Sequence, residues 1–400
     1  MINRLRLLTM LALSWLALGI PSGAQTHDHS AMTATDGEFN PYVVSDNRGG
    51  FYVAYIQRKN GASNVMLQHS GPSGAPSVAV QINNRSGDAA VRNENPPKIA
   101  VGPKNELYVV WASERERWKG NIRFARSLNG GKTFEPAIDL NSDASQQPIS
   151  RAFQSIAVDA KGRILIAWID ERRKTPKARG AEIWMTTSED GGKTFSSDRR
   201  IVSDVCECCR TALGIDSNGS IYLSYRRVPP AGPMFRDIAV ARSDDGGKTF
   251  NSTIVSQDRW ELNGCPIAGA TMTVTASGRV HVAWFTQIGE TPRLYIASSI
   301  DHGASFSTPT VFDPTQKLAK HAHAVAASGS QVLIAWDDLN GKSLVRWGLF
   351  DTTTKSMRIL GSRNAASYPI VAMSGGRIGV VTLQPDQPRL FRSFQVASIR

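Results

Sequence analysis

Short apolar runs that alternate with polar positions recur along the whole chain, separated by turns rich in Gly, Asn and Asp. An extended run, a turn and a second run that ends in Trp, Tyr or another large apolar residue recur seven times. These copies begin at Pro41, Pro97, Gln154, Thr211, Ala270, Ala324 and Pro369. Alternation with a period of two, broken by a tight turn, predicts a β-hairpin. The pattern therefore predicts an all-β chain of seven similar units, most of about 56 residues.

A second repeated phrase follows four of these hairpins. It reads SLNGGKTF from Ser127, SEDGGKTF from Ser188, SDDGGKTF from Ser243 and SIDHGASF from Ser299. The Asn or Asp side chain accepts hydrogen bonds from nearby backbone amides, and the glycines adopt positive φ without steric cost. We expect the final Phe to pack back into the sheet. The phrase resembles the Asp-box of the sialidase-like (BNR repeat) β-propellers, in which the box is a structural turn.

This resemblance implies a β-propeller with four-stranded blades, and the seven hairpins favour seven blades. Six blades, as in sialidases proper, is the alternative, and two separate β domains is another. The last unit lacks a fourth strand, which residues before Pro41 could supply to close the ring. We expect a single propeller domain over residues 39–400, preceded by a His- and Met-containing segment over 25–38.

The first residues have the pattern of an export signal. Arg4 and Arg6 precede an apolar stretch over residues 7–20, and small residues precede Gln25. This predicts a secretory signal peptide over residues 1–24, with an uncleaved anchor as the alternative. The mature protein is then soluble and either periplasmic or secreted. The net charge of +12 is scattered along the chain, which favours small anionic ligands or glycans, and no basic, aromatic-interleaved stripe indicates nucleic acid.

In a propeller blade, the loop that enters the inner strand lies on the same face as the loop after the second strand. The Asp-box turns lie on the opposite face. Aligned on the repeat, the residues at the inner-strand entrances are Asn40, Asn95, Arg151, Cys209, Cys265, His321 and Tyr368. We expect these side chains to ring the mouth of a central channel, which makes that mouth the default candidate site.

Cysteine and histidine supply the first candidate chemistry. Cys209, Cys265 and His321 follow one another at the repeat spacing, which predicts neighbouring positions on three blades. Thiolate and imidazole ligands suit copper or zinc. The candidate metal ligands are Cys206, Cys208, Cys209, Cys265, His321, His323, His27 and His29. Disulfides are the alternative, because exported chains oxidise their cysteines. A bridge from Cys265 to the CECC segment, a second bridge within that segment, and a mixed state with two oxidised cysteines all remain open.

The N-terminal histidines offer a separate copper-binding possibility. After cleavage at Ala24, His27 would be the third residue of the mature chain. A free amine with His third suits square-planar Cu(II) or Ni(II). Cyclisation of Gln25 would remove that amine.

The resemblance to sialidases implies a second chemistry. That family holds its substrate carboxylate with three arginines and uses a Tyr nucleophile assisted by Glu, with an Asp as acid/base. The candidates for carboxylate binding are Arg151, Arg172, Arg210 and Arg226, and the catalytic candidates are Tyr368, Glu171 and Asp170. Asn40 stands where the family's first arginine is expected, which argues against sialidase activity. The alternative is that these arginines pair with nearby carboxylates as loop charges.

Three functions follow from these patterns. The first is an exported ligand-binding propeller with a Cys/His metal or redox site at the channel mouth. The second is an exo-acting glycoside hydrolase on an acidic sugar. The third is a scaffold that binds protein partners through its faces.

Overall fold

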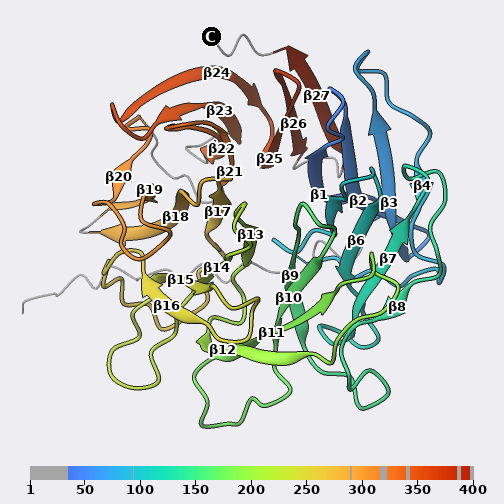
Figure 1. The fold of residues 1–400 in the computed structure, drawn as a ribbon, viewed down its shortest axis with the longest axis horizontal. Helices are drawn as coiled ribbons and strands as arrows, with labels where there is room; N and C mark the ends of the chain where they lie inside the picture. Colours follow the sequence, from blue (N-terminus) through green and yellow to red (C-terminus); the bar gives the residue numbers. More distant parts are fainter. Residues whose placement is uncertain are drawn as a thin grey trace, which may run out of the picture.

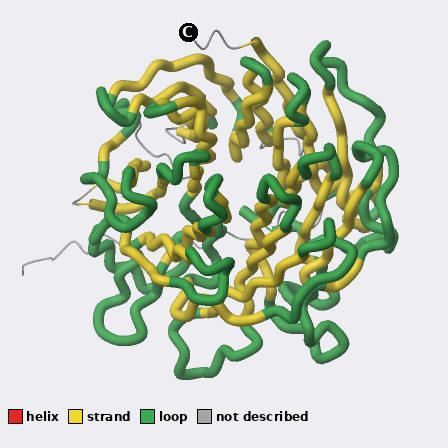
Figure 2. Tube along the Cα trace, viewed as in Figure 1, coloured by secondary structure: helices red, strands yellow, loops and turns green. Residues whose placement is uncertain are grey.

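Seven antiparallel sheets surround a common axis in the computed structural model, which describes residues 35–92, 94–288, 291–315, 322–338, 343–384 and 389–396. Figure 1 shows the blades in chain order around the ring, and Figure 2 shows only strands and loops in the described residues. Six sheets have four strands and the last has three. The predicted all-β propeller with seven blades is confirmed, and the alternatives of six blades and of two separate β domains are wrong.

Each blade runs outward from its inner strand in chain order. Blades 1 to 3 comprise β1 (Gly37–Ser45), β2 (Phe51–Lys59), β3 (Ala62–Ser70), β4 (Val80–Gln81); β5 (Lys98–Val101), β6 (Leu107–Ala112), β7 (Ile122–Ser127), β8 (Ile138–Asp139); and β9 (Arg151–Val158), β10 (Ile164–Asp170), β11 (Ala181–Ser188), β12 (Arg199–Val205). Blades 4 and 5 comprise β13 (Ala212–Ile215), β14 (Ile221–Arg226), β15 (Ile238–Ser243), β16 (Asn251–Ile254); and β17 (Thr271–Val274), β18 (Val280–Ile288), β19 (Thr291–Ser299), β20 (Thr310–Val311). Blades 6 and 7 comprise β21 (Ala322–Ser328), β22 (Gln331–Asp338), β23 (Leu344–Asp351), β24 (Ser356–Asn364); and β25 (Ser367–Ser374), β26 (Arg377–Leu383), β27 (Leu390–Val396).

The hydrophobic core lies between neighbouring blades. Leu165 of β10 and Leu223 of β14, for example, belong to one buried cluster. The second strand of many blades contains a fully buried Trp, as in Trp111, Trp168 and Trp284. Each side chain of this size contributes roughly 1.5–3 kcal/mol by leaving water. The repeated hydrophobic pattern therefore builds the contacts that hold one blade against the next.

The Asp-box phrases form the turns after the third strands, as predicted. In the second copy, the carboxylate of Asp190 accepts hydrogen bonds from the backbone N–H and the hydroxyl of Thr194, at 2.9 and 2.6 Å. Gly192 has a φ of +79°, which glycine adopts without strain. Phe195 packs edge-on against Phe124 of blade 2, with ring centroids 4.8 Å apart. The box therefore joins its blade to the preceding one.

Side chains close the ring between the first and last blades. The hydroxyl of Ser45 donates to that of Ser374 at 2.8 Å, and Glu38 accepts from the backbone N–H of Leu390 at 3.0 Å and pairs with Arg392 at 3.2 Å. Residues 37–40, which were candidates for a fourth strand of blade 7, begin β1 of blade 1 instead.

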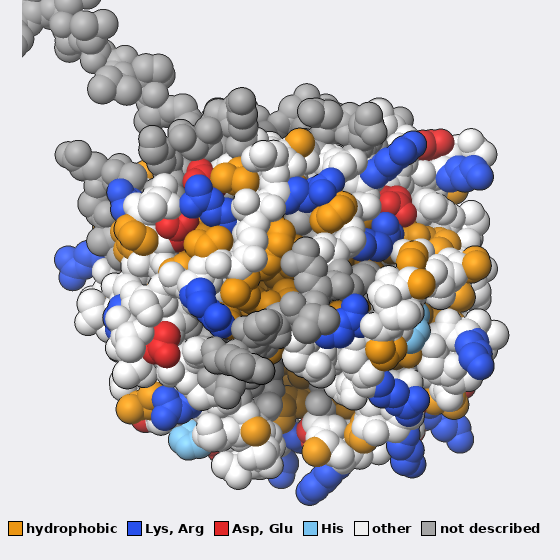
Figure 3. All heavy atoms as spheres, turned by 90° about the horizontal axis from the view of Figure 1, so that it is seen from above, with side chains coloured by type: hydrophobic (Ala, Val, Ile, Leu, Met, Phe, Trp, Pro, Cys, Tyr) orange, Lys and Arg blue, Asp and Glu red, His pale blue; other side chains and the backbone are white. Residues whose placement is uncertain are grey.

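The expected signal peptide lies outside the described residues. In the described part of the chain, the structure contains no helix long and apolar enough to cross a membrane. Lys and Arg side chains are spread over the side of the molecule shown in Figure 3 and do not gather in one patch there.

Candidate functional site

Four cysteines meet between blades 4 and 5 and form what we call the thiol cluster: Cys206, Cys208, Cys209 and Cys265. The first three lie in the loop between β12 and β13, and Cys265 lies in the loop before β17. A disulfide joins Cys208 to Cys265, with their Cα atoms 6.3 Å apart. The predicted bridge from Cys265 to the CECC segment is therefore confirmed, and Cys208 provides its other end.

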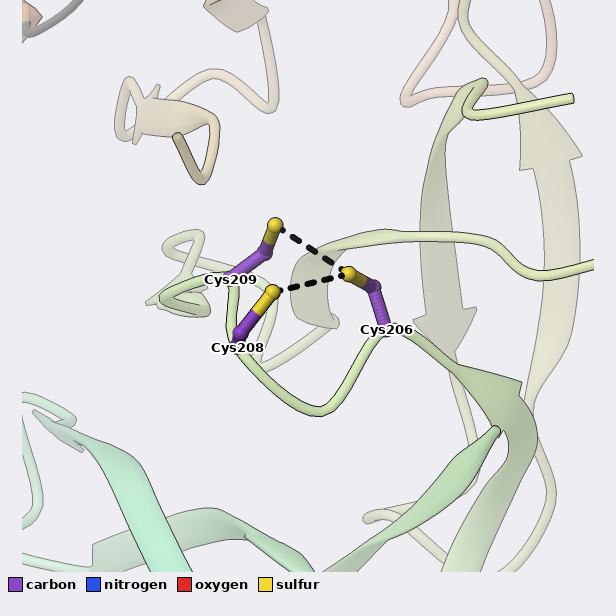
Figure 4. Close-up of side chains that lie close together, drawn as sticks. All are labelled: Cys206, Cys208 and Cys209. Atoms are coloured by element: carbon purple, nitrogen blue, oxygen red, sulfur yellow. Dashed lines mark hydrogen bonds between the residues drawn. The ribbon is translucent and has the colours of Figure 1, made fainter. Parts of the chain in front are cut away.

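Cys206 and Cys209 are unbridged and buried, and Figure 4 shows their sulfur atoms close to that of Cys208. The Sγ of Cys206 donates to that of Cys209 at 3.3 Å and lies 3.5 Å from that of Cys208. Burial raises the pKa of Cys209, but the hydrogen bond from Cys206 and the charge of Arg226 outweigh it and lower that pKa. The three sulfur atoms of the CECC segment all lie within 4.8 Å of one another, so the arrangement matches the mixed state of two oxidised and two free cysteines.

The candidate histidines do not complete this cluster among the described residues. His321, His27 and His29 lie outside those residues, and His323 lines the central channel instead. Its Nδ1 accepts from the backbone N–H of Val371 at 3.2 Å. Burial, together with the charges of Lys98 and Arg210, lowers the pKa of His323 well below its usual value.

A second arrangement occupies the mouth of the channel. The cavity there is lined by Asn40, Glu94, Lys98, Arg210, His323 and Tyr368, together with Pro41, Pro96, Ile370 and Leu383. Arg210, which directly follows Cys209, donates through Nη1 to Glu94 Oε1 at 2.9 Å and through Nη2 to the carbonyl of Ala322. Glu94 also accepts from the backbone N–H of Gly269 at 3.2 Å. The mouth is therefore built across blades 1, 2, 4, 6 and 7.

Three of these lining residues have left-handed backbone conformations. The φ angles of Asn40, Glu94 and Tyr368 are +50°, +60° and +51°. A non-glycine residue in this region costs roughly 1 kcal/mol or more, and such residues concentrate at functional sites. The predicted ring was right at Asn40 and Tyr368. At two blades the neighbouring residues Glu94 and Arg210 line the cavity in place of Asn95 and Cys209. Arg151 and Cys265, which were also expected in the ring, do not line it.

Tyr368 is a neutral phenol in this setting. Burial raises its pKa, and the negative charges of Glu94 and Asp337 raise it further. Arg210 opposes this shift but does not outweigh it. A nucleophilic tyrosinate would need the opposite shift or an adjacent base.

Arg151, Arg172 and Asp170 form an ion-pair network within blade 3 and its loops. Asp170 is fully buried and accepts from Arg151 at 2.9 Å and from Arg172 at 2.6 Å. Arg151 also pairs with Asp143 at 2.6 Å, and Arg172 with Asp198 at 2.6 Å. Both arginines are therefore paired with nearby carboxylates, which is the alternative that the sequence left open.

Arg226 and Glu171 are also engaged away from the mouth. Arg226 is fully buried and donates to the carbonyls of Arg236, Ala268 and Phe285 at 2.5 to 2.8 Å. Glu171 pairs with Lys174 at 3.4 Å. Of the residues considered for hydrolysis, only Tyr368 and Arg210 line the mouth cavity, so the structure does not bring the expected catalytic set together.

The sequence matches the family of BNR repeat-like domains over residues 74–380. The chain belongs to this family. The BNR repeat-like fold also occurs in solved structures that share 10 to 18% identity with this chain. A protein of unknown function from Dyadobacter fermentans is 18% identical with a TM-score of 0.54, covering 90% of this chain and 95% of its own.

Two further solved structures of similar fold are named for activities on glycans. A PL25 ulvan lyase is 12% identical with a TM-score of 0.60, covering 91% of this chain and 95% of its own. A mutant NanB sialidase from Streptococcus pneumoniae is 10% identical with a TM-score of 0.52, covering 88% and 90%. At these identities the likeness concerns the fold alone. No curated protein matches the sequence.

Sequence reasoning missed two residues at the mouth of this BNR repeat-like propeller. Glu94 is the partner of Arg210, and Lys98 begins the inner strand β5. A signal for Lys98 was present, because a lysine within an inner strand faces either the channel or a neighbouring blade. Nothing in the local pattern around Glu94 indicated that it would meet Arg210.

Proposed function

We propose that this BNR repeat-like protein is an exported ligand-binding propeller whose thiol cluster binds a thiophilic metal ion. The metal is copper(I) while the Cys208–Cys265 bridge is intact, and zinc can enter once that bridge is reduced. One observation carries the proposal: Cys206 and Cys209 are buried and unbridged, with sulfur atoms 3.3 Å apart. The signal-like N-terminus supports export.

The ligand set decides between the two metals. Thiolates select soft ions such as Cu(I), whereas structural zinc is almost always held by four ligands. With the bridge intact, the thiol cluster offers two thiols, from Cys206 and Cys209. Reduction would release two more, and Cys265 is exposed enough for a reductant to reach the bridge. We therefore expect copper(I) in the bridged protein and zinc only in the reduced protein.

The test compares metal content and metal affinity in the mature chain. Copper and zinc are measured by mass spectrometry in protein as isolated and after reduction, and Cu(I) affinity by competition with a chromophoric chelator. Cys206→Ser and Cys209→Ser each remove one of the two thiols. The double variant Cys208→Ser, Cys265→Ser is the matched control, because it keeps both free thiols and removes two other sulfur atoms from the same cluster.

We expect one Cu(I) per chain in the bridged wild type and the double variant, and at least a tenfold weaker Cu(I) affinity in each single variant. Equal affinity in all four proteins would contradict the proposal. If no metal binds but Cys206 and Cys209 form a reversible disulfide, the cluster is a redox site instead.

A second candidate function, action on an acidic glycan, is favoured by Tyr368, Arg210 and Glu94 at the channel mouth. Solved structures of similar fold include sialidases and ulvan lyases, and acidic sugars would find a cation in Arg210. Turnover of fluorogenic sialosides or uronate-containing polysaccharides that Tyr368→Phe abolishes would support this function. Absence of turnover across both panels would remove it.

A further inference from the structure

The cavity at the channel mouth has a neighbour deeper between the blades. This second cavity, about 190 Å³, is lined by Tyr42, Lys98, Arg210 and His323 together with residues of the inner strands β9, β13 and β17. Lys98, Arg210 and His323 line both cavities. We propose that this channel is a binding site for one compact oxyanion, a small carboxylate or inorganic phosphate, held by Lys98, His323 and Tyr42.

Among the described residues, the ammonium group of Lys98 has no partner that would balance its charge. Its side chain is 9% exposed, and its ammonium lies 3.9 Å from the centroid of the Tyr42 ring. In the described part of the chain it makes no hydrogen bond and has no carboxylate within ion-pair distance. Buried ammonium groups are strongly disfavoured unless they are paired. An anion in the channel would supply the missing partner.

The neighbouring groups add hydrogen-bond donors. Because Nδ1 of His323 accepts from Val371, the neutral ring carries its proton on Nε2, where it can donate. The ring of Tyr42 stands edge-on to that of His323, with centroids 5.7 Å apart. The Tyr42 hydroxyl makes no hydrogen bond within the described residues. These three side chains, from β1, β5 and β21, thus present free donors to one space.

The carboxylate in the channel is already engaged. Glu94 is the only carboxylate among the described residues that line either cavity, and it receives hydrogen bonds from Arg210 and Gly269. The hydroxyls of Ser155 and Thr211 bond to each other at 3.0 Å. Among the described residues, the deeper cavity therefore has cationic side chains and free donors in its lining but no carboxylate, which matches an acceptor-rich, negatively charged ligand.

The size of the space restricts the ligand further. Pockets for drug-sized molecules measure about 300–1,000 Å³, and the deeper cavity is smaller, at about 190 Å³. A polysaccharide chain does not fit inside it, whereas a compact oxyanion does. The site is also separate from the thiol cluster, so a test of anion binding is independent of a test of metal binding.

The experiment measures anion affinity in the mature protein. Inorganic phosphate and succinate are titrated separately at pH 6 by isothermal calorimetry, with wild type, Lys98→Met and Tyr42→Phe. The matched control is Lys104→Met, because Lys104 is an exposed lysine in the turn that follows β5 in the same blade. Thermal unfolding of each variant shows whether it folds.

We expect at least one of the two anions to bind wild type and Lys104→Met with equal affinity. Lys98→Met should weaken this binding at least tenfold, and Tyr42→Phe about threefold. Binding of phosphate would identify the ligand as inorganic phosphate, and binding of succinate would identify it as a small carboxylate. Binding of neither anion to the wild type, or equal binding by Lys98→Met, would overturn the proposal; if Lys98→Met fails to fold, an unchanged affinity in Tyr42→Phe would do so as well.

Discussion

Nη1 of Arg210 lies 2.9 Å from Oε1 of Glu94, and this ion pair joins two blades across 116 residues of sequence. The Glu94 carboxylate is fully buried, and the Arg210 side chain is 12% exposed. Removal of one partner of such a pair leaves an uncompensated charge in a poorly hydrated space. The pair therefore determines both the shape of the channel mouth and a part of the stability.

Glu94→Gln tests this pair. We expect the free energy of unfolding to fall by about 3 kcal/mol, because the Arg210 guanidinium stays buried without its counter-charge. The measurement is urea denaturation followed by Trp fluorescence. Glu116→Gln is the control, since Glu116 forms an exposed pair with Lys119 at 3.4 Å and should change stability by less than about 0.5 kcal/mol. Equal effects of the two substitutions would show that the buried pair stabilises the fold no more than the exposed pair does.

The disulfide gives a second prediction. We expect denatured, unreduced protein to show two reactive thiols, from Cys206 and Cys209. Cys265→Ser should lower the free energy of unfolding by about 2–4 kcal/mol, because it opens the loop closed between residues 208 and 265. A count of four thiols would contradict the bridge, and a count of none would show that Cys206 and Cys209 are oxidised as well. In reducing buffer, wild type and Cys265→Ser should have similar stability.

Gly269 positions Arg210. A Cβ atom at Gly269 would lie 2.3 Å from Cγ of Arg210 and 2.4 Å from its carbonyl oxygen. Gly269→Ala must therefore displace Arg210, and the hydrogen bond from Gly269 to Glu94 with it. We expect a loss of about 1–3 kcal/mol in unfolding free energy, together with weaker anion binding in the channel. Gly264→Ala is the control, because a Cβ atom at Gly264 would have its nearest neighbour 4.0 Å away; an equal loss there would contradict this role of Gly269.

The blades could be predicted from the sequence because their information is local. Alternation, the hairpin turns and the Asp-box hydrogen bonds each involve residues close along the chain, such as Asp190 and Thr194. The spacing of the repeat also predicted that Cys265 would meet the CECC segment. It could not predict that Cys208 rather than Cys209 forms the bridge, because that choice depends on the local path of the loop.

The channel mouth was harder to predict, because its contacts join residues that are far apart in the sequence. Arg151 and Arg172 pair with Asp143 and Asp198 in the loops next to their own blade, which is the alternative of local pairing. Arg210 instead pairs with Glu94 of a different blade. Glu94 has a left-handed backbone conformation, and it lines the mouth where the repeat spacing predicted Asn95. Contacts between loops of different blades have no periodic signature, so only the structure identifies them.

The last prediction concerns the pH dependence of stability. It rests on Lys98, which is buried and has a lowered pKa. Burial and the charge of Arg210 lower the pKa of Lys98 to about 7, from an ordinary value of 10.5, and Glu94 opposes this shift only in part. Tyr42 and His323 are the other titratable groups beside it. Between these two pH values the unfolded chain binds more protons than the folded one, so stability rises with pH across that window.

We expect the free energy of unfolding of the wild type, without added anion, to increase by a few kcal/mol between pH 7 and pH 10. Lys98→Met should remove most of this increase and should be more stable than wild type at pH 7, because it has no ammonium to bury. Lys104→Met should keep the wild-type slope. A bound anion should flatten the wild-type curve, because it favours protonated Lys98 and therefore stabilises the folded state more at pH 7 than at pH 10. If Lys98→Met and wild type show the same slope in urea titrations at matched pH, Lys98 is not the group responsible.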